Sequence, residues 1–117
     1  MFYSIIQFCP EPIRKEYTSI GVIIKEINPV SIKYKVIKCY DRARDYHRIN
    51  FEDEFIFDAA SDFLKTVAKI YSEIDPLGVK SNIFISSRCN MFYLTPWNVY
   101  FNIKNPLDEI FQETILE

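Results

Sequence analysis

The sequence predicts one α+β domain over residues 1–117: an antiparallel or mixed sheet led by an N-terminal β-hairpin, with a long middle helix and a C-terminal helix packed on it. Two apolar segments flank a short proline-containing insert within residues 3–27, as in a hairpin. Apolar residues recur at alternating steps of four and three over residues 56–74, the period of one helix face. Asn105 and Pro106 are typical of a helix start.

The hairpin is predicted to lie at the centre of the sheet. Its strands are expected over residues 2–9 and 17–27, and both are apolar at odd and even positions, so both faces should be covered. Pro10 and Pro12 end the first strand because neither can donate a backbone hydrogen bond. Gly21, inside an apolar run, indicates a bulge or the close approach of another element, and we expect a helix to cross there.

Two less regular segments follow the hairpin. Residues 32–38 alternate apolar and polar side chains, which predicts a third strand with one solvent-facing side, near the sheet edge. Residues 40–49 predict a short helix or an irregular connection. Opposite charges stand three residues apart in two places, where a helix would let them meet: Asp41 with Arg44, and Asp45 with Arg48.

The long middle helix should cover one face of the hairpin sheet with its apolar stripe. Asp53 or Asp58 is expected to cap this helix, and Asp75 with Pro76 to end it. The stripe consists of Ile56, Ala60, Phe63, Val67, Ile70 and Ile74.

The C-terminal third should complete the sheet. Residues 82–87 favour a strand, and short strands are expected over residues 91–95 and 98–103 on either side of a bend at Pro96. The last helix should dock on the core through one apolar face, made of Leu107, Ile110, Phe111 and Ile115.

Composition limits the function. Half of the 117 residues are hydrophobic, which allows a core without disulfides or a structural metal, and the two glycines exclude a phosphate-cradling loop. The net charge of −2 argues against broad nucleic-acid binding. The odd cysteine count without close pairs predicts reduced thiols in the cytoplasm. We expect no metal, no cofactor, no membrane segment and no catalytic residue.

The predicted hairpin bend carries candidate binding residues, Arg14, Glu16 and Tyr17. The planar guanidinium of Arg14 suits a bidentate phosphate or carboxylate ligand. Arg14 could instead pair with Glu16 and fix the bend, which needs no ligand. Both interpretations stay open.

A second candidate is the basic cluster Arg42, Arg44 and Arg48. Together with Tyr40 and Tyr46 as stacking surfaces, it could contact a phosphate or a nucleic acid. The interleaved aspartates favour a solvated, self-paired face instead. His47, the only histidine, is expected at the surface, and the acidic run Glu52, Asp53, Glu54 and Asp58 is expected to serve the helix start rather than a metal.

Aromatic residues around Pro96 form the third candidate. Trp97 and Tyr100, with Phe92, Tyr93 and Phe101, could make an apolar contact surface for another protein. They could equally fill the core.

Both ends of the chain carry a distinctive set of motifs: YSIIQF at residues 3–8, PEPIR at 10–14, Glu16, IGV at 20–22, TP at 95–96 and NPLDEIF at 105–111. In these motifs the chain resembles a small bacterial family known as domain of unknown function 3037. Lys15 and Ser19 depart from the family pattern, where Gly and Asn are usual.

This resemblance implies a partner, because members of the family are often encoded beside a HipA-like kinase. We therefore expect a non-catalytic protein-binding or regulatory component, with that kinase as its partner in a bacterial two-gene system of the toxin–antitoxin or defence type. The alternatives are an enzyme or nucleic-acid-processing factor that uses the bend and the basic cluster, and a homo-oligomeric structural module.

Overall fold

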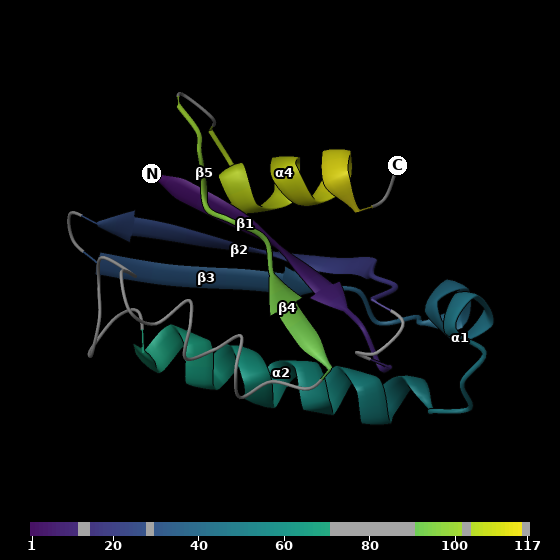
Figure 1. Ribbon diagram of the computed structural model, residues 1–117. Coiled ribbons are helices and arrows are strands. Elements are labelled where there is room, and N and C mark those ends of the chain that lie inside the picture. Colours follow the sequence, from purple (N-terminus) through teal and green to yellow (C-terminus); the bar gives the residue numbers. More distant parts are fainter. Residues whose placement is uncertain (12–14, 28–29, 71–90, 102–103, 116–117) are drawn as a thin grey trace.

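The computed structural model describes residues 1–11, 15–27, 30–70, 91–101 and 104–115, apart from the side chains of Ile27 and Val30. The described elements alternate between one sheet and the helices that cover it (Figure 1). They are β1 (Phe2–Phe8), β2 (Thr18–Ile27), β3 (Val30–Val36), α1 (Asp41–His47), α2 (Asp53–Lys69), β4 (Phe92–Leu94), β5 (Asn98–Val99) and α4 (Pro106–Thr114).

The N-terminal hairpin forms the middle of the sheet, as predicted. Among the described strands the order is β3-β2-β1-β4, and β5 also pairs with β1. The pairings of β1 with β2, β4 and β5, and of β2 with β3, are antiparallel. The expected α+β class is therefore confirmed, and β3 lies at the edge.

Helices cover both faces of the hairpin, which explains why its strands are apolar at odd and even positions. In Figure 1, α2 runs along one face and α4 lies on the other. The first core cluster, on the α2 side, contains Ile6, Phe8 and Ile23 from the hairpin and Leu64 from α2, among others. The second core cluster, on the α4 side, contains Val22, Ile24, Tyr100, Ile110 and Phe111.

A β-bulge in β2 sits at Ile20. Ile6 pairs with Gly21, whereas Gln7 pairs with Ser19, so Ile20 is the extra residue. A Cβ atom on Gly21 would lie 2.4 Å from the carbonyl oxygen of Lys35. The predicted close approach is thus correct, but the neighbour is the backbone of β3 and not a crossing helix.

The start of α2 differs from the prediction, whereas α4 starts where it was predicted. Helix α2 begins at Asp53 after Glu52, with no side-chain cap, so neither Asp53 nor Asp58 caps it. The Asp53 carboxylate instead accepts the backbone N–H of Tyr40 at 2.9 Å. Asn105 precedes α4 as expected, but its side chain makes no capping hydrogen bond.

Only one of the two expected ion pairs on α1 is formed. Arg44 pairs with Asp41. The helix ends at His47, and Arg48 takes the left-handed conformation with φ of 55°. Arg48 therefore leaves the helical face on which Asp45 could have met it, and no ion pair joins these two residues.

Several predictions lie partly or wholly outside the described residues: the strand over 82–87, the end of the strand over 98–103, the helix end at Asp75 and Pro76, Ile74 of the apolar stripe, and Arg14. The other stripe residues of α2, such as Ile56 and Val67, are buried as predicted. Across the described ranges, the structure contains no helix of the length and apolar character that a bilayer span requires.

Candidate binding groove between α1 and β2

The groove lies where β3 separates from β2. The last β2–β3 contacts are the pair Gly21–Val36 and a hydrogen bond of 2.9 Å from the Ile37 N–H to the Ile20 carbonyl. Beyond Ile37 the chain turns away into α1. Thr18 and Ser19 pair with β1 on one side, and no described strand pairs with them on the other.

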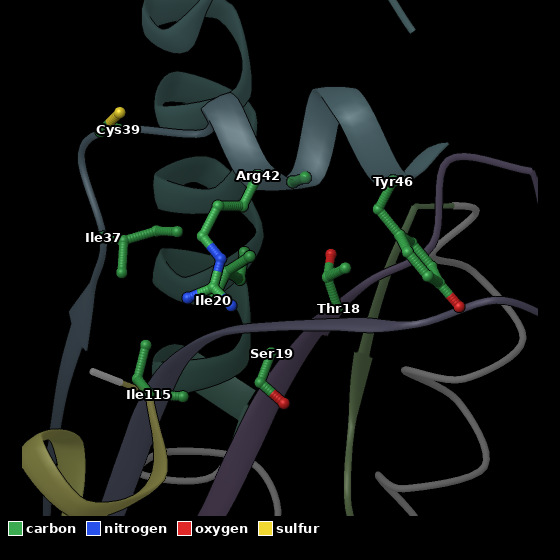
Figure 2. Close-up of a pocket in the computed structure, with 9 residues that line it drawn as sticks. Thr18, Ser19, Ile20, Ile37, Cys39, Arg42, Tyr46 and Ile115 are labelled. Atoms are coloured by element: carbon green, nitrogen blue, oxygen red, sulfur yellow. The ribbon is translucent and has the colours of Figure 1, made fainter. Parts of the chain in front are cut away.

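Helix α1 lies above this uncovered piece of β2, and the space between them is a cavity of about 420 Å³ (Figure 2). We call it the α1–β2 groove. Its lining combines aliphatic side chains with hydroxyl groups and one cation, from Thr18, Ser19, Ile20, Ile37, Cys39, Arg42, Ala43, Tyr46 and Ile115.

Arg42 is the cation of the groove. Figure 2 shows its side chain extending from α1 toward β2, and Ile20 lines the same cavity. Arg42 is exposed. No carboxylate of the described residues pairs with it, although the chain carries more acidic than basic residues.

Arg44, only two residues away, is used internally. Its guanidinium pairs with Asp41 and Asp53 and donates to the carbonyl oxygen of Phe51 at 3.3 Å. The Tyr40 N–H and Arg44 together lower the pKa of Asp53, because both stabilise its charged form. Arg44 therefore fastens α1 to the start of α2.

The contacts of Arg44 also explain why several potential metal ligands lie close together. Cys39, Asp41 and Asp53 offer ligand atoms within 4.8 Å of one another. Both carboxylates already pair with the Arg44 guanidinium. The cation that this cluster requires is thus supplied by the protein itself, and we assign no metal site there.

His47 fixes the other side of α1 and is not at the surface, which corrects the sequence prediction. It is 4% exposed, because the ring packs edge-on against Phe8 and Tyr46. Its Nε2 lies 3.1 Å from the Thr18 hydroxyl. Burial lowers the pKa of His47, while Glu16 and Glu11 oppose that shift.

The predicted bend site is only partly described. Arg14 lies outside the described residues, so its pairing with Glu16 stays a prediction. Glu16 is half-buried, and Tyr17 is 40% exposed. The ring of Tyr17 is edge-on to the ring of Tyr93, and the two ring centres are 5.3 Å apart. Lys15 has φ of 54°, the left-handed region that favours glycine.

The aromatic candidates divide between core and surface. Tyr100 is 6% exposed and belongs to the second core cluster. It therefore fills the core, which was the second of the two predicted alternatives. Trp97 is half-buried, and its ring centre lies 4.8 Å from the Nζ of Lys25, itself 3% exposed. Phe101, at 77% exposure, is the aromatic of this group that reaches the surface.

The structure thus brings together a site that the sequence flagged only in part. Of the predicted binding residues that the structure describes, Arg42 alone lines the groove. Tyr46, which the sequence analysis considered as a stacking surface, also lines it. Thr18, Ser19 and Ile115 were missed, because nothing in their local pattern indicates that α1 and the end of α4 meet over β2. The sequence signal that pointed here was the density of arginines over residues 42–48.

Comparisons with models of protein families, with curated proteins and with solved structures find no match to this chain. The family resemblance of the chain ends therefore stays a prediction.

Proposed function

We propose that this chain is a non-catalytic protein-binding module whose partner enters the α1–β2 groove. The observation that carries the proposal is Arg42, a cation presented in an open, largely aliphatic cavity without a carboxylate partner among the described residues. Arg44, by contrast, serves the fold through its pairs with Asp41 and Asp53. An unpaired guanidinium between aliphatic walls suits a ligand that supplies the missing charge.

Catalysis is less well supported. The Thr18 hydroxyl and His47 stand 3.1 Å apart, the separation of a nucleophile and its base. However, no described carboxylate is hydrogen-bonded to His47, and the ring is covered by Phe8 and Tyr46. Burial also raises the pKa of the Cys9 thiol, which keeps it in the unreactive protonated form. The Thr18–His47 contact is better understood as a fastening of α1 to β2.

Nucleic-acid binding is also less well supported, because the three described arginines differ in their surroundings. Arg42 lies in the groove, Arg44 is neutralised by two aspartates, and Arg48 stands beyond the helix end. Backbone recognition of nucleic acids needs several unpaired cations side by side.

The family resemblance suggests which partner to test first. We propose a HipA-like kinase in the cytoplasm as that first candidate, with this chain as the regulatory member of a two-gene system. The proposal of a binding module does not depend on this choice, since it rests on the groove.

The test compares two arginine variants. Binding of the candidate kinase is measured by calorimetry with three purified proteins: the original chain, Arg42→Ala and Arg48→Ala. Both arginines are exposed, so both variants should fold, which circular dichroism checks. We expect Arg42→Ala to weaken binding about tenfold or more, since a charge-assisted contact contributes roughly 1.5–3 kcal/mol. Arg48→Ala should bind as the original chain does. Equal binding by all three proteins would contradict the proposal.

A further inference from the structure

We propose that the α1–β2 groove recognises the C-terminus of the partner chain, with the terminal carboxylate on Arg42 and an apolar last side chain against the aliphatic lining. This inference rests on the proposed binding function and names the chemistry that the groove selects.

The charge of the groove fits a single carboxylate. A guanidinium presents its N–H groups as a planar fork that matches the two oxygens of a carboxylate. Among the described residues Arg42 is the one cationic side chain in the lining, and the whole chain carries a net charge of −2. A dianionic phosphate would require more positive charge than the groove supplies, whereas a monoanion requires one cation.

The walls fit an apolar side chain next to that carboxylate. Ile20, Ile37, Ala43 and Ile115 line the groove around the guanidinium. Its volume of about 420 Å³ is at the low end of the range of about 300–1,000 Å³ for ligand pockets. It therefore suits one or two residues of a peptide rather than the face of a long helix.

The floor fits an extended main chain. Over Thr18 and Ser19, β2 has β1 on one side and no described strand on the other, so a peptide could pair there as an added strand. The Ile37–Ile20 hydrogen bond closes this edge after two residues. Figure 2 shows Ile37 and Ile115 at this closed side and Tyr46 at the opposite side.

The closed side distinguishes a chain end from an internal segment. A strand that enters past Tyr46 along Thr18 and Ser19 meets the Ile37–Ile20 hydrogen bond and cannot continue in register. Because Arg42 extends from α1 toward β2 and lines the same cavity, a terminal carboxylate is the group that would meet its guanidinium there.

The test uses peptides and nuclear magnetic resonance. Acetylated tripeptides Thr-Val-X, in which X is Leu, Ile, Val or Phe, are titrated into ¹⁵N-labelled protein, each as the free acid and as the C-terminal amide. We expect at least one free acid to shift the backbone amide signals of Thr18, Ser19 and Ile20. The C-terminal amide of the same peptide should bind at least about tenfold more weakly. Arg42→Ala should abolish the difference between acid and amide, and Arg48→Ala should keep it.

Three results would overturn the inference. The first is no shift with any free acid, and the second is equal binding of acid and amide. The third is equal binding of an amidated peptide with an internal Asp, which would assign the groove to a side-chain carboxylate.

An experiment with the partner protein distinguishes failure of this inference from failure of the proposed function. If a partner with its last residues removed still binds and Arg42→Ala still weakens it, the binding module stands and terminus recognition falls.

Discussion

Arg42 and Arg44 lie on one short helix and differ only in what faces them. Arg44 meets Asp53, which belongs to the start of α2, whereas Arg42 faces the start of β2, where the described lining offers hydroxyl groups and aliphatic side chains. The sequence predicted the pair of Arg44 with Asp41, which the structure confirms. It could not show the second pair of Arg44, because the Asp53 carboxylate comes from another element.

Gly21 is the residue at which a single methyl group should be most disruptive in the sheet. In Gly21→Ala, the new Cβ would lie 2.4 Å from the Lys35 carbonyl oxygen, and a backbone atom cannot rotate away as a side chain can. We expect the free energy of unfolding to fall by about 1–3 kcal/mol, as for other overpacked sites. Urea denaturation measures it.

Lys33→Ala, at an exposed position of neighbouring β3, is the control and should change the free energy of unfolding by less than about 0.5 kcal/mol. An unchanged stability of Gly21→Ala would show that β2 and β3 are not in such close contact.

His47 should make stability depend on pH. Burial lowers its pKa below the ordinary 6.5, so between these two values the unfolded chain binds a proton that the folded chain does not. The free energy of unfolding should therefore fall as the pH drops below about 6.5 and level off above it. Urea midpoints measured between about pH 5 and 8 test this, a range that lies above the titration of Asp53.

His47→Gln, which can still bond to the Thr18 hydroxyl, should flatten this dependence. An equal drop in the original chain and in His47→Gln would assign the effect to a group other than His47.

At the scale of elements, α1 is a short helix held at both ends by contacts to other elements. Tyr40 and Arg44 bind Asp53 of α2, and His47 meets Thr18 of β2. A helix of seven residues is not stable alone, so these contacts set its position and with it the roof of the groove.

Asp53→Ala should therefore loosen α1 without unfolding the sheet. We expect faster amide hydrogen exchange in α1 and weaker ligand binding in the groove, because the anchor of Arg44 and of the Tyr40 N–H is lost. Hydrogen exchange followed by mass spectrometry separates α1 from β1 and β2. Glu54→Ala, the exposed next residue, is the matched control. Equal exchange in both variants would mean that Asp53 does not hold α1.

Strong periodic signals predicted the elements well. The hairpin strands were placed within one residue of β1 and β2, and the stripe of α2 is buried where it is described. The cap predicted for α2 failed, because Asp53 has a tertiary use that outweighs local capping, whereas Asn105 does stand at the N-cap position of α4. Helix α1 could not be told from an irregular segment, since its short, charged sequence has too few apolar positions to show a period.

At the scale of the whole molecule, the arrangement follows from one property of the sequence, the apolar character of both faces of the hairpin. It predicted the central position of β1 and β2, and the structure shows α2 and α4 covering the two faces. The groove could not be predicted in this way. It combines residues 18–19, 42 and 115, which meet only because β3 leaves the sheet early and α4 ends beside it.

The central position of the N-terminal strands has a consequence for synthesis on the ribosome. Translation makes β1 and β2 first, yet Val22 and Ile24 are covered by α4, which is made after all the other described elements. One side of the nascent ribbon thus stays uncovered until α4 has left the exit tunnel. During translation the nascent chain therefore exposes apolar strand surface, of the kind that chaperones cover to prevent aggregation.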